Sequence, residues 1–83
     1  MRVLIIQGPQ GSGKASRLNW HRERNPTALV EDEVTVAQFQ QLTVANTKLL
    51  IVTMSSQTYE NIPLTLMCAR RLTIKVETLI KEI

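Results

Sequence analysis

Cysteine, glycine, proline and aromatic residues are all scarce in this chain of 83 residues. Cys68 is the only cysteine, which excludes an intramolecular disulfide and a cysteine-rich zinc site and favours a reducing, cytoplasmic location. Long apolar runs are also missing. The first apolar segment, at residues 3–6, leads straight into a glycine-rich segment and is too short for a signal-peptide core or a membrane span. We therefore expect neither targeting nor membrane insertion.

Repeats, low-complexity tracts and linkers are missing as well, so residues 1–83 are expected to form one domain. A chain of this size buries only about 60–65% of the surface that its unfolded form exposes, which leaves a thin margin of stability. Apolar residues make up 43% of the chain, which is enough to form a core without metals. The net charge of +3 permits contact with nucleotide phosphates or nucleic acid without requiring either.

Strands and helices alternate in the predicted order of elements. Strand patterns occupy residues 2–7, 27–31, 48–54 and 74–78, and helical patterns occupy residues 13–24, 35–46 and 63–71. The second helix should begin with a capping box, because Gln38 follows Thr35 by three positions. Residues 55–58 are expected to be a polar loop, and residues 79–83 a short helix or a frayed end.

This alternation predicts an α/β fold in three layers, with a small parallel sheet of about four strands and helices on its faces. Ligands of such sheets bind beyond the carboxyl ends of the strands. A glycine-rich loop and an acidic segment both follow strands in this chain. We therefore expect them to meet at one edge of the sheet.

The glycine-rich loop has the spacing of a phosphate-binding loop, with Gly8 followed after four residues by Gly13 and Lys14. Backbone N–H groups of such a loop close around phosphate oxygens, and the following helix turns its positive dipole end to the anion. Gly11 and Gly13 leave the backbone free to adopt positive φ, and Lys14 would reach the β- and γ-phosphates. The alternative is a strand-to-helix turn that binds nothing.

Over about eight residues this segment resembles the Walker A loop of P-loop NTPases. The resemblance implies that a nucleotide is bound by a set of loop residues, namely Gly8, Gly11, Ser12, Gly13, Lys14, Ala15 and Ser16. One position departs from the pattern, because Ala15 stands where a Ser or Thr hydroxyl normally binds Mg²⁺. The hydroxyl of Ser16 comes one residue later and is rotated about 100° around the helix. We expect this departure to impair hydrolysis more than binding.

The segment from Ala28 to Glu33 is apolar and then acidic, and it resembles a short Walker B strand. That resemblance implies that Asp32 holds the metal and that Glu33 polarises the attacking water. It also implies that Lys14 takes part in catalysis. An alternative is that the acids only favour the first turn of the next helix. The branch of P-loop ATPases that includes the AAA+ proteins also has a polar residue at the end of the third predicted strand, which hydrogen-bonds the γ-phosphate or the attacking water. The resemblance implies that Thr53 or Ser55 fills this position, and the alternative is an ordinary exit from the strand into a loop.

The order of these segments resembles a reduced core of that branch and implies the sheet order 2-3-1-4, with the acidic strand at an edge. Arg70 and Arg71 would be arginine fingers for a neighbouring copy, or simply cations at a helix end. The helical lid and the fifth strand that members of the branch carry are missing, and a kinase would need a lid and an acceptor pocket that this chain does not offer.

A basic stripe runs along the first predicted helix, which carries Lys14, Arg17, His21 and Arg24 at spacings of three, four and three. It could meet nucleic-acid phosphates, but aromatic stacking platforms are scarce, and a solvated face is the alternative. Trp20 among these residues is also compatible with a protein contact. His21 lacks an acid and a nucleophile at any informative spacing, so a hydrolytic triad has no support.

Two functions therefore follow from the sequence. The first is a nucleotide-binding protein that takes ATP or another triphosphate, with Mg²⁺ if a metal binds, and hydrolyses it weakly or not at all. The second is a regulatory module that retains the scaffold of the loop but binds a larger protein or its own copies without nucleotide.

Overall fold

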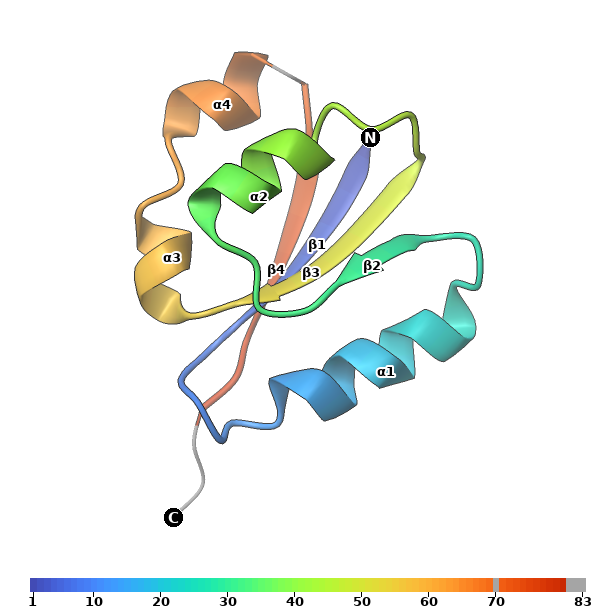
Figure 1. Ribbon diagram of the computed structural model, residues 1–83, viewed down its shortest axis with the longest axis vertical. Coiled ribbons are helices and arrows are strands. Elements are labelled where there is room, and N and C mark those ends of the chain that lie inside the picture. The colour runs from blue at the N-terminus through green and yellow to red at the C-terminus, as the bar shows by residue number, and fades with distance from the viewer. Residues whose placement is uncertain (70, 81–83) are drawn as a thin grey trace.

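A parallel four-stranded sheet in the order β2-β3-β1-β4 forms the centre of the molecule (Figure 1). The structure is a computed structural model and describes residues 1–69 and 71–80. Its elements in chain order are β1 (Arg2–Gln7), α1 (Lys14–Arg24), β2 (Leu29–Glu31), α2 (Val36–Leu42), β3 (Leu49–Met54), α3 (Ser56–Glu60), α4 (Leu64–Ala69) and β4 (Thr73–Thr78). The α/β class and the strand order agree with the sequence prediction.

The two central strands carry the apolar runs, and the two edge strands do not. β1 pairs with β3 on one side and with β4 on the other, while β2 pairs only with β3. Residues 3–6 and 50–54 are buried because helices cover both faces of these strands. β4 lies at an edge, and its exposure alternates along the strand.

Two apolar clusters lie on opposite faces of the sheet. On one face Leu18 of α1 packs with Leu4, Ile6 and Ile51. On the other face a larger cluster forms around Phe39, which is fully buried, and includes Ile62 after α3. Figure 1 shows α1 on one side of the sheet and α2, α3 and α4 on the other. The central strands are therefore sandwiched between helices.

The structure corrects the prediction of a polar loop at residues 55–58. Ser56–Glu60 form the short helix α3, because the side chain of Ser55 accepts a hydrogen bond from the Thr58 N–H and caps the helix. A side-chain cap of the same kind is correctly predicted for α2, where the capping box of Thr35 and Gln38 is present. Polar residues after a strand can start a helix as readily as they form a loop.

Several predicted elements are longer than the observed ones. α2 ends at Leu42 rather than near Asn46, because Thr43 closes the helix with a hydrogen bond from its hydroxyl to the Gln40 carbonyl. α4 ends at Ala69, and Arg71 has a positive φ of 51°, which is not helical. Arg70, the other expected arginine finger, lies outside the described residues. The expected tail element at residues 79–83 is not helical at 79 and 80, and the rest of it lies outside the described residues.

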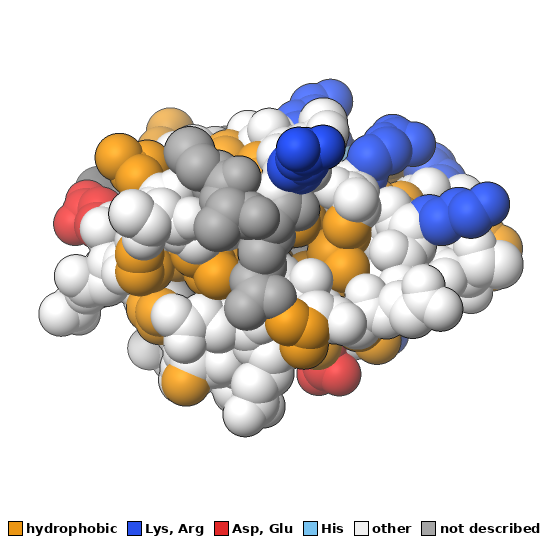
Figure 2. Space-filling view, turned by 90° about the horizontal axis from the view of Figure 1, so that it is seen from above, with side chains coloured by type: hydrophobic (Ala, Val, Ile, Leu, Met, Phe, Trp, Pro, Cys, Tyr) orange, Lys and Arg blue, Asp and Glu red, His pale blue; other side chains and the backbone are white. Residues whose placement is uncertain are grey.

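Charged side chains are separated along the strand direction. Four acidic residues lie where strands finish: Glu31 ends β2, Asp32 and Glu33 follow it, and Glu77 lies near the end of β4. Figure 2 views the opposite end, where the strands begin, and shows Lys and Arg side chains gathered over one half of it, with acidic side chains only near its margins. The two ends of the sheet thus present different charges to solvent.

Within residues 1–69 and 71–80, no helix has both the length and the apolar character needed to cross a membrane.

Candidate functional site

The glycine-rich loop joins β1 to α1 and contains two residues in the left-handed region. Gly11 has a φ of 82° and Gly13 a φ of 89°. Gly13 is the N-cap residue of α1, and no side chain caps the helix there. A residue with a Cβ would be strained in this conformation, so both glycines are needed for the path of the loop.

Most of the loop amides have no internal acceptor. The Ser12 N–H donates to the Pro9 carbonyl at 3.2 Å, and the Arg17 N–H donates to the Gly13 carbonyl at 3.1 Å. Within the described part of the chain, no acceptor receives the N–H groups of Gly11, Gly13, Lys14, Ala15 and Ser16. Unsatisfied N–H groups in the first turn of a helix carry a positive partial charge. The loop therefore has the donors that an anion would accept.

Lys14 is the buried cation of this loop. Only 7% of its surface is exposed, and its Nζ donates to the Gly8 carbonyl at 2.8 Å. The same Nζ lies 2.8 Å from the Glu33 carboxylate, whose side chain is 58% exposed. The residue predicted to contact the phosphates thus pairs with the residue predicted to polarise water.

Gly8 and Ser12 contribute to packing beneath the loop. A Cβ on Gly8 would lie 2.7 Å from the Leu79 carbonyl oxygen and 2.9 Å from the Ser12 hydroxyl. The Leu79 N–H donates to the Gln7 carbonyl, which holds the chain after β4 against the start of the loop. The Ser12 hydroxyl is buried and has no hydrogen-bond partner among the described residues. Gly8 is therefore required by close approach rather than by a positive φ.

A cavity of about 270 Å³ lies between the loop and the acidic segment. It is lined by Gln10, Gly11, Gly13, Lys14, Ala15, Ser16, Asp32 and Glu33. The structure thus brings together most of the predicted site, including Ser16 beside Ala15. Gly8 and Ser12 do not line this cavity, and Ser55 lines a neighbouring one together with Gln10, Lys14 and Glu33.

Thr53 determines the shape of the acidic segment. Its buried hydroxyl donates to the Asp32 carboxylate and accepts the Glu33 N–H at 2.6 Å. Its carbonyl also accepts the Val34 N–H at 2.9 Å. Glu33 adopts a positive φ of 48° between these bonds. The polar residue expected near the phosphates therefore orients the two acids directly.

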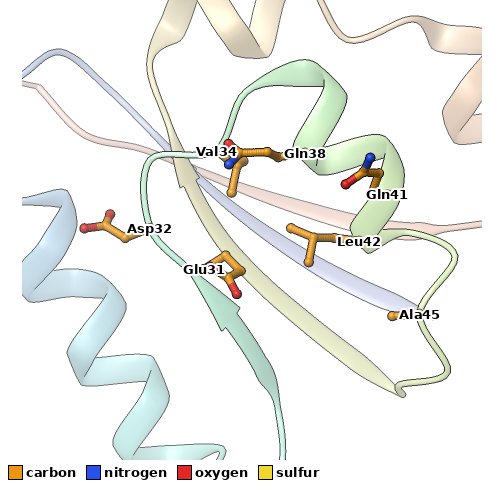
Figure 3. Close-up of a pocket in the computed structure, with 7 residues that line it drawn as sticks. All are labelled: Glu31, Asp32, Val34, Gln38, Gln41, Leu42 and Ala45. Carbon is orange, nitrogen blue, oxygen red and sulfur yellow. The ribbon is translucent and has the colours of Figure 1, made fainter.

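Asp32 is the predicted metal ligand, and it turns towards α1. Figure 3 shows its carboxylate pointing away from Gln38 and Gln41, although Asp32 and these two residues all line another cavity of about 270 Å³ between β2 and α2. Among residues 1–69 and 71–80, no group of three His, Cys, Asp or Glu side chains is placed to hold a metal ion. Mg²⁺ commonly uses one or two carboxylates and takes its other ligands from substrate phosphates and water. Asp32 fits that pattern only together with a phosphate ligand.

The predicted basic stripe on α1 is largely occupied by contacts within the chain. Arg17 donates to both carboxylate oxygens of Glu77, at 2.7 and 3.1 Å, and His21 Nε2 lies 2.9 Å from the same carboxylate. The hydrogen bond from Arg17 lowers the pKa of Glu77 and outweighs the opposing effect of burial, and His21 lowers this pKa further. Lys14 pairs with Glu33, so Arg24 is the one member of the stripe without an acidic partner among the described residues, and it donates to the Trp20 carbonyl at 3.0 Å.

Glu77 was missed as a partner for His21 by sequence reasoning. The alternation of side chains along β4 gave one indication: Val76 and Ile74 lie on one face of the strand, and Glu77 lies with Lys75 on the other. That α1 would cover this face near Glu77 could be seen only in three dimensions.

Comparisons of this chain with family models, with curated proteins and with solved structures found no match.

Proposed function

We propose that this protein binds a nucleoside triphosphate, with ATP as the first candidate, through the loop between β1 and α1 on a P-loop type of fold. The observation that carries the proposal is the set of amides without an acceptor among the described residues, those of Gly11, Gly13, Lys14, Ala15 and Ser16, which lie beside the buried ammonium of Lys14 at one cavity. Amides without an internal acceptor give up no hydrogen bond when they receive an anion.

Phosphate binding requires Lys14 to exchange partners. Its Nζ now contacts the Gly8 carbonyl and the Glu33 carboxylate, both at 2.8 Å. A phosphate carries more charge than one carboxylate and also engages the loop amides, so it competes well for this ammonium. Glu33 is largely exposed, and it can leave the pair without being buried as an isolated charge.

Hydrolysis is proposed to be weak or absent. Ala15 has no hydroxyl for Mg²⁺, so Asp32 is left as the carboxylate that would hold this ion when it arrives with the nucleotide. Mg²⁺ would supply charge neutralisation at the phosphates. Glu33 would orient water only after leaving Lys14, and the bonds of Thr53 restrict where its backbone can move.

One observation favours the alternative function, an interaction module that needs no nucleotide. The ammonium of Lys14 is already neutralised by Glu33 and satisfied by the Gly8 carbonyl. A loop whose lysine is internally paired is stable without an anion. The partner of such a module would be another protein or a second copy of the chain.

Isothermal titration with ATP, with and without Mg²⁺, separates these functions. Nucleotide binding predicts a saturable signal that Lys14→Ala weakens by about 10- to 100-fold, because a hydrogen bond to a charged group contributes about 1.5–3 kcal/mol. Lys48→Ala is the matched control, since it removes an exposed lysine just before β3, at the opposite end of the sheet. Absence of binding in the unaltered protein, or equal loss in both variants, would refute the nucleotide proposal.

A further inference from the structure

A second cavity lies at the end of the sheet where the strands begin, away from the glycine-rich loop. Its volume is about 310 Å³, and its polar lining consists of Arg2, His21, Asn25, Thr73 and Lys75. Side chains of β1 and β3 form an apolar floor. It is therefore a groove between the C-terminal half of α1 and the first halves of β1 and β4. We call this feature the cationic groove.

The strand register directs both basic side chains of the sheet into the cationic groove. Lys75 is the register partner of Leu4, and Leu4 packs against Leu18 of α1. Paired residues of adjacent strands lie on the same face of a sheet, and Arg2 shares that face because it is two residues before Leu4. Arg2 and Lys75 therefore both belong to the face that α1 covers.

These cations have no internal counter-charge. Within the described part of the chain, no acid forms an ion pair with Arg2, Arg24 or Lys75. The cations near the strand ends differ, because Lys14 and Arg17 each contact a carboxylate. α1 does contain one acid, Glu23, and it is exposed and likewise unpaired among the described residues. The gathering of Lys and Arg side chains at this end is visible in Figure 2.

An aromatic platform adjoins the cationic groove. Trp20 is 41% exposed although it is the largest side chain of α1, and its ring contacts that of His21 edge-on, with centroids 4.8 Å apart. The guanidinium of Arg24 lies 3.7 Å from the centre of the Trp20 ring, and that of Arg17 lies 4.3 Å from it. His21 belongs both to this cluster and to the lining of the groove. The platform and the groove therefore form one continuous surface.

We propose that this surface binds single-stranded nucleic acid. The phosphates would contact Arg2 and Lys75, and Arg24 would leave the Trp20 ring for a phosphate while a base takes its place on the ring. Unpaired cations beside an exposed aromatic ring are the combination that single-strand binding uses, because every base has a face for stacking and every linkage has a charge. A duplex keeps its bases stacked and offers none to the ring, and an acidic polypeptide would make no use of the ring. This inference does not depend on nucleotide binding at the loop.

The test is fluorescence anisotropy with a labelled single-stranded oligonucleotide of mixed sequence and about one dozen nucleotides, across a salt series. Binding should weaken with salt, and the double variant Arg2→Ala/Lys75→Ala should reduce the slope of log K against log salt by about 1.4, because each phosphate contact contributes about 0.7. Its affinity should fall by at least tenfold. Thermal unfolding of each variant shows whether it remains folded.

Gln40→Glu/Gln41→Glu is the matched control, since it lowers the net charge equally at two exposed positions of α2 on the other face of the sheet. Equal losses in the two double variants would mean attraction by net charge alone and would overturn the proposal. Trp20→Ala provides a second route. This variant should weaken the affinity for the normal oligonucleotide by on the order of tenfold and change the affinity for an abasic one little.

Two further results would overturn the inference. One is the absence of salt-sensitive binding by the unaltered protein. The other is competition by polyglutamate as strong as that by unlabelled oligonucleotide, which would assign the surface to an acidic protein partner.

Discussion

The ammonium of Lys14 lies 2.8 Å from the carboxylate of Glu33, so the proposed phosphate ligand and the proposed water-orienting group neutralise each other in the absence of nucleotide. This contact links affinity and hydrolysis. Under the proposed function, an incoming phosphate displaces Glu33 from Lys14, and only a displaced Glu33 would act on water.

We expect Glu33→Gln to tighten ATP binding by up to about fivefold, because an ion pair with a largely exposed partner contributes at most about 1 kcal/mol. Any hydrolysis should fall in the same variant. Calorimetry and a phosphate-release assay measure the two effects. Glu31→Gln is the control, since it removes one negative charge from the same segment without touching Lys14. Weaker ATP binding by Glu33→Gln would contradict the competition.

Ala15→Thr should restore a hydroxyl at the place where P-loop NTPases bind Mg²⁺. We expect ATP affinity to become more dependent on Mg²⁺ and phosphate release to rise. Titrations over a range of Mg²⁺ concentrations and steady-state release rates test this. Ser16→Thr adds only a methyl group at the next position and should change neither. An unchanged rate in Ala15→Thr would show that the missing hydroxyl does not limit turnover.

Gly8→Ala should destabilise the fold, because the new Cβ would lie 2.7 Å from the backbone oxygen of Leu79. Overpacking of this kind costs about 1–3 kcal/mol, which urea denaturation can measure. Gly13→Ala provides a comparison with a different cause. No atom lies within 4 Å of its Cβ position, but its φ of 89° imposes a strain of roughly 1–2 kcal/mol. If Gly8→Ala is neutral, the chain after β4 does not pack on the loop as described.

Thr53→Val keeps the shape of a buried side chain but removes the hydroxyl that joins Asp32 to the Glu33 N–H. The loss of these bonds should cost about 1–3 kcal/mol and weaken ATP binding, because the acidic segment is no longer held against the cavity. Urea denaturation and calorimetry report the two effects. Thr53→Ser retains the hydroxyl and should preserve ATP affinity. If both variants bind ATP like the unaltered protein, Thr53 does not position the site.

Glu77 gives the stability a defined dependence on pH. Its pKa is lowered in the folded protein, first by the hydrogen bond from Arg17 and then by His21. The stabilisation is therefore complete above the pKa of the unfolded carboxyl, about 4.3, and is lost as the pH falls through the lower folded value. Glu77→Gln should reduce the melting temperature near neutral pH, and the difference from the unaltered protein should shrink towards pH 3.

Melting curves from pH 3 to pH 7 test this dependence. Glu60→Gln is the control, because Glu60 is exposed at the end of α3 and has no ion-pair partner among the described residues. A difference that stays constant down to pH 3 would show that the Glu77 carboxylate is not the titrating group.

Local sequence signals predicted most of the fold because they arise from short-range physics. The apolar runs of β1 and β3 indicated strands covered on both faces, and the Thr35 capping box located the start of α2. The sequence does not predict helix α3, because its cap, Ser55, lies in a polar run that is also typical of a loop. Ends of elements were misplaced where a single side-chain bond decides them, as at Thr43.

Most of the residues that the sequence predicts for the site line one cavity, but the sequence did not predict the contacts between them. The spacing of Gly8, Gly13 and Lys14 indicated a phosphate-binding loop, and the acids after β2 were placed at the same edge of the sheet. Nothing in a linear pattern showed that Glu33 pairs with Lys14 or that Thr53 holds Asp32. These contacts join segments about twenty residues apart.

By itself the sequence determined the kind of fold, the position of the glycine-rich loop and the residues that gather at the carboxyl ends of the strands, because periodicity and spacing act within one element and its neighbours. Only the tertiary structure decided which charges are used internally. Glu77 contacts Arg17 and His21. At the other end of the sheet, Arg2 and Lys75 have no acidic partner among the described residues. Ion pairing depends on distances of a few ångströms between distant segments, and the strand register sets those distances once the whole sheet has formed.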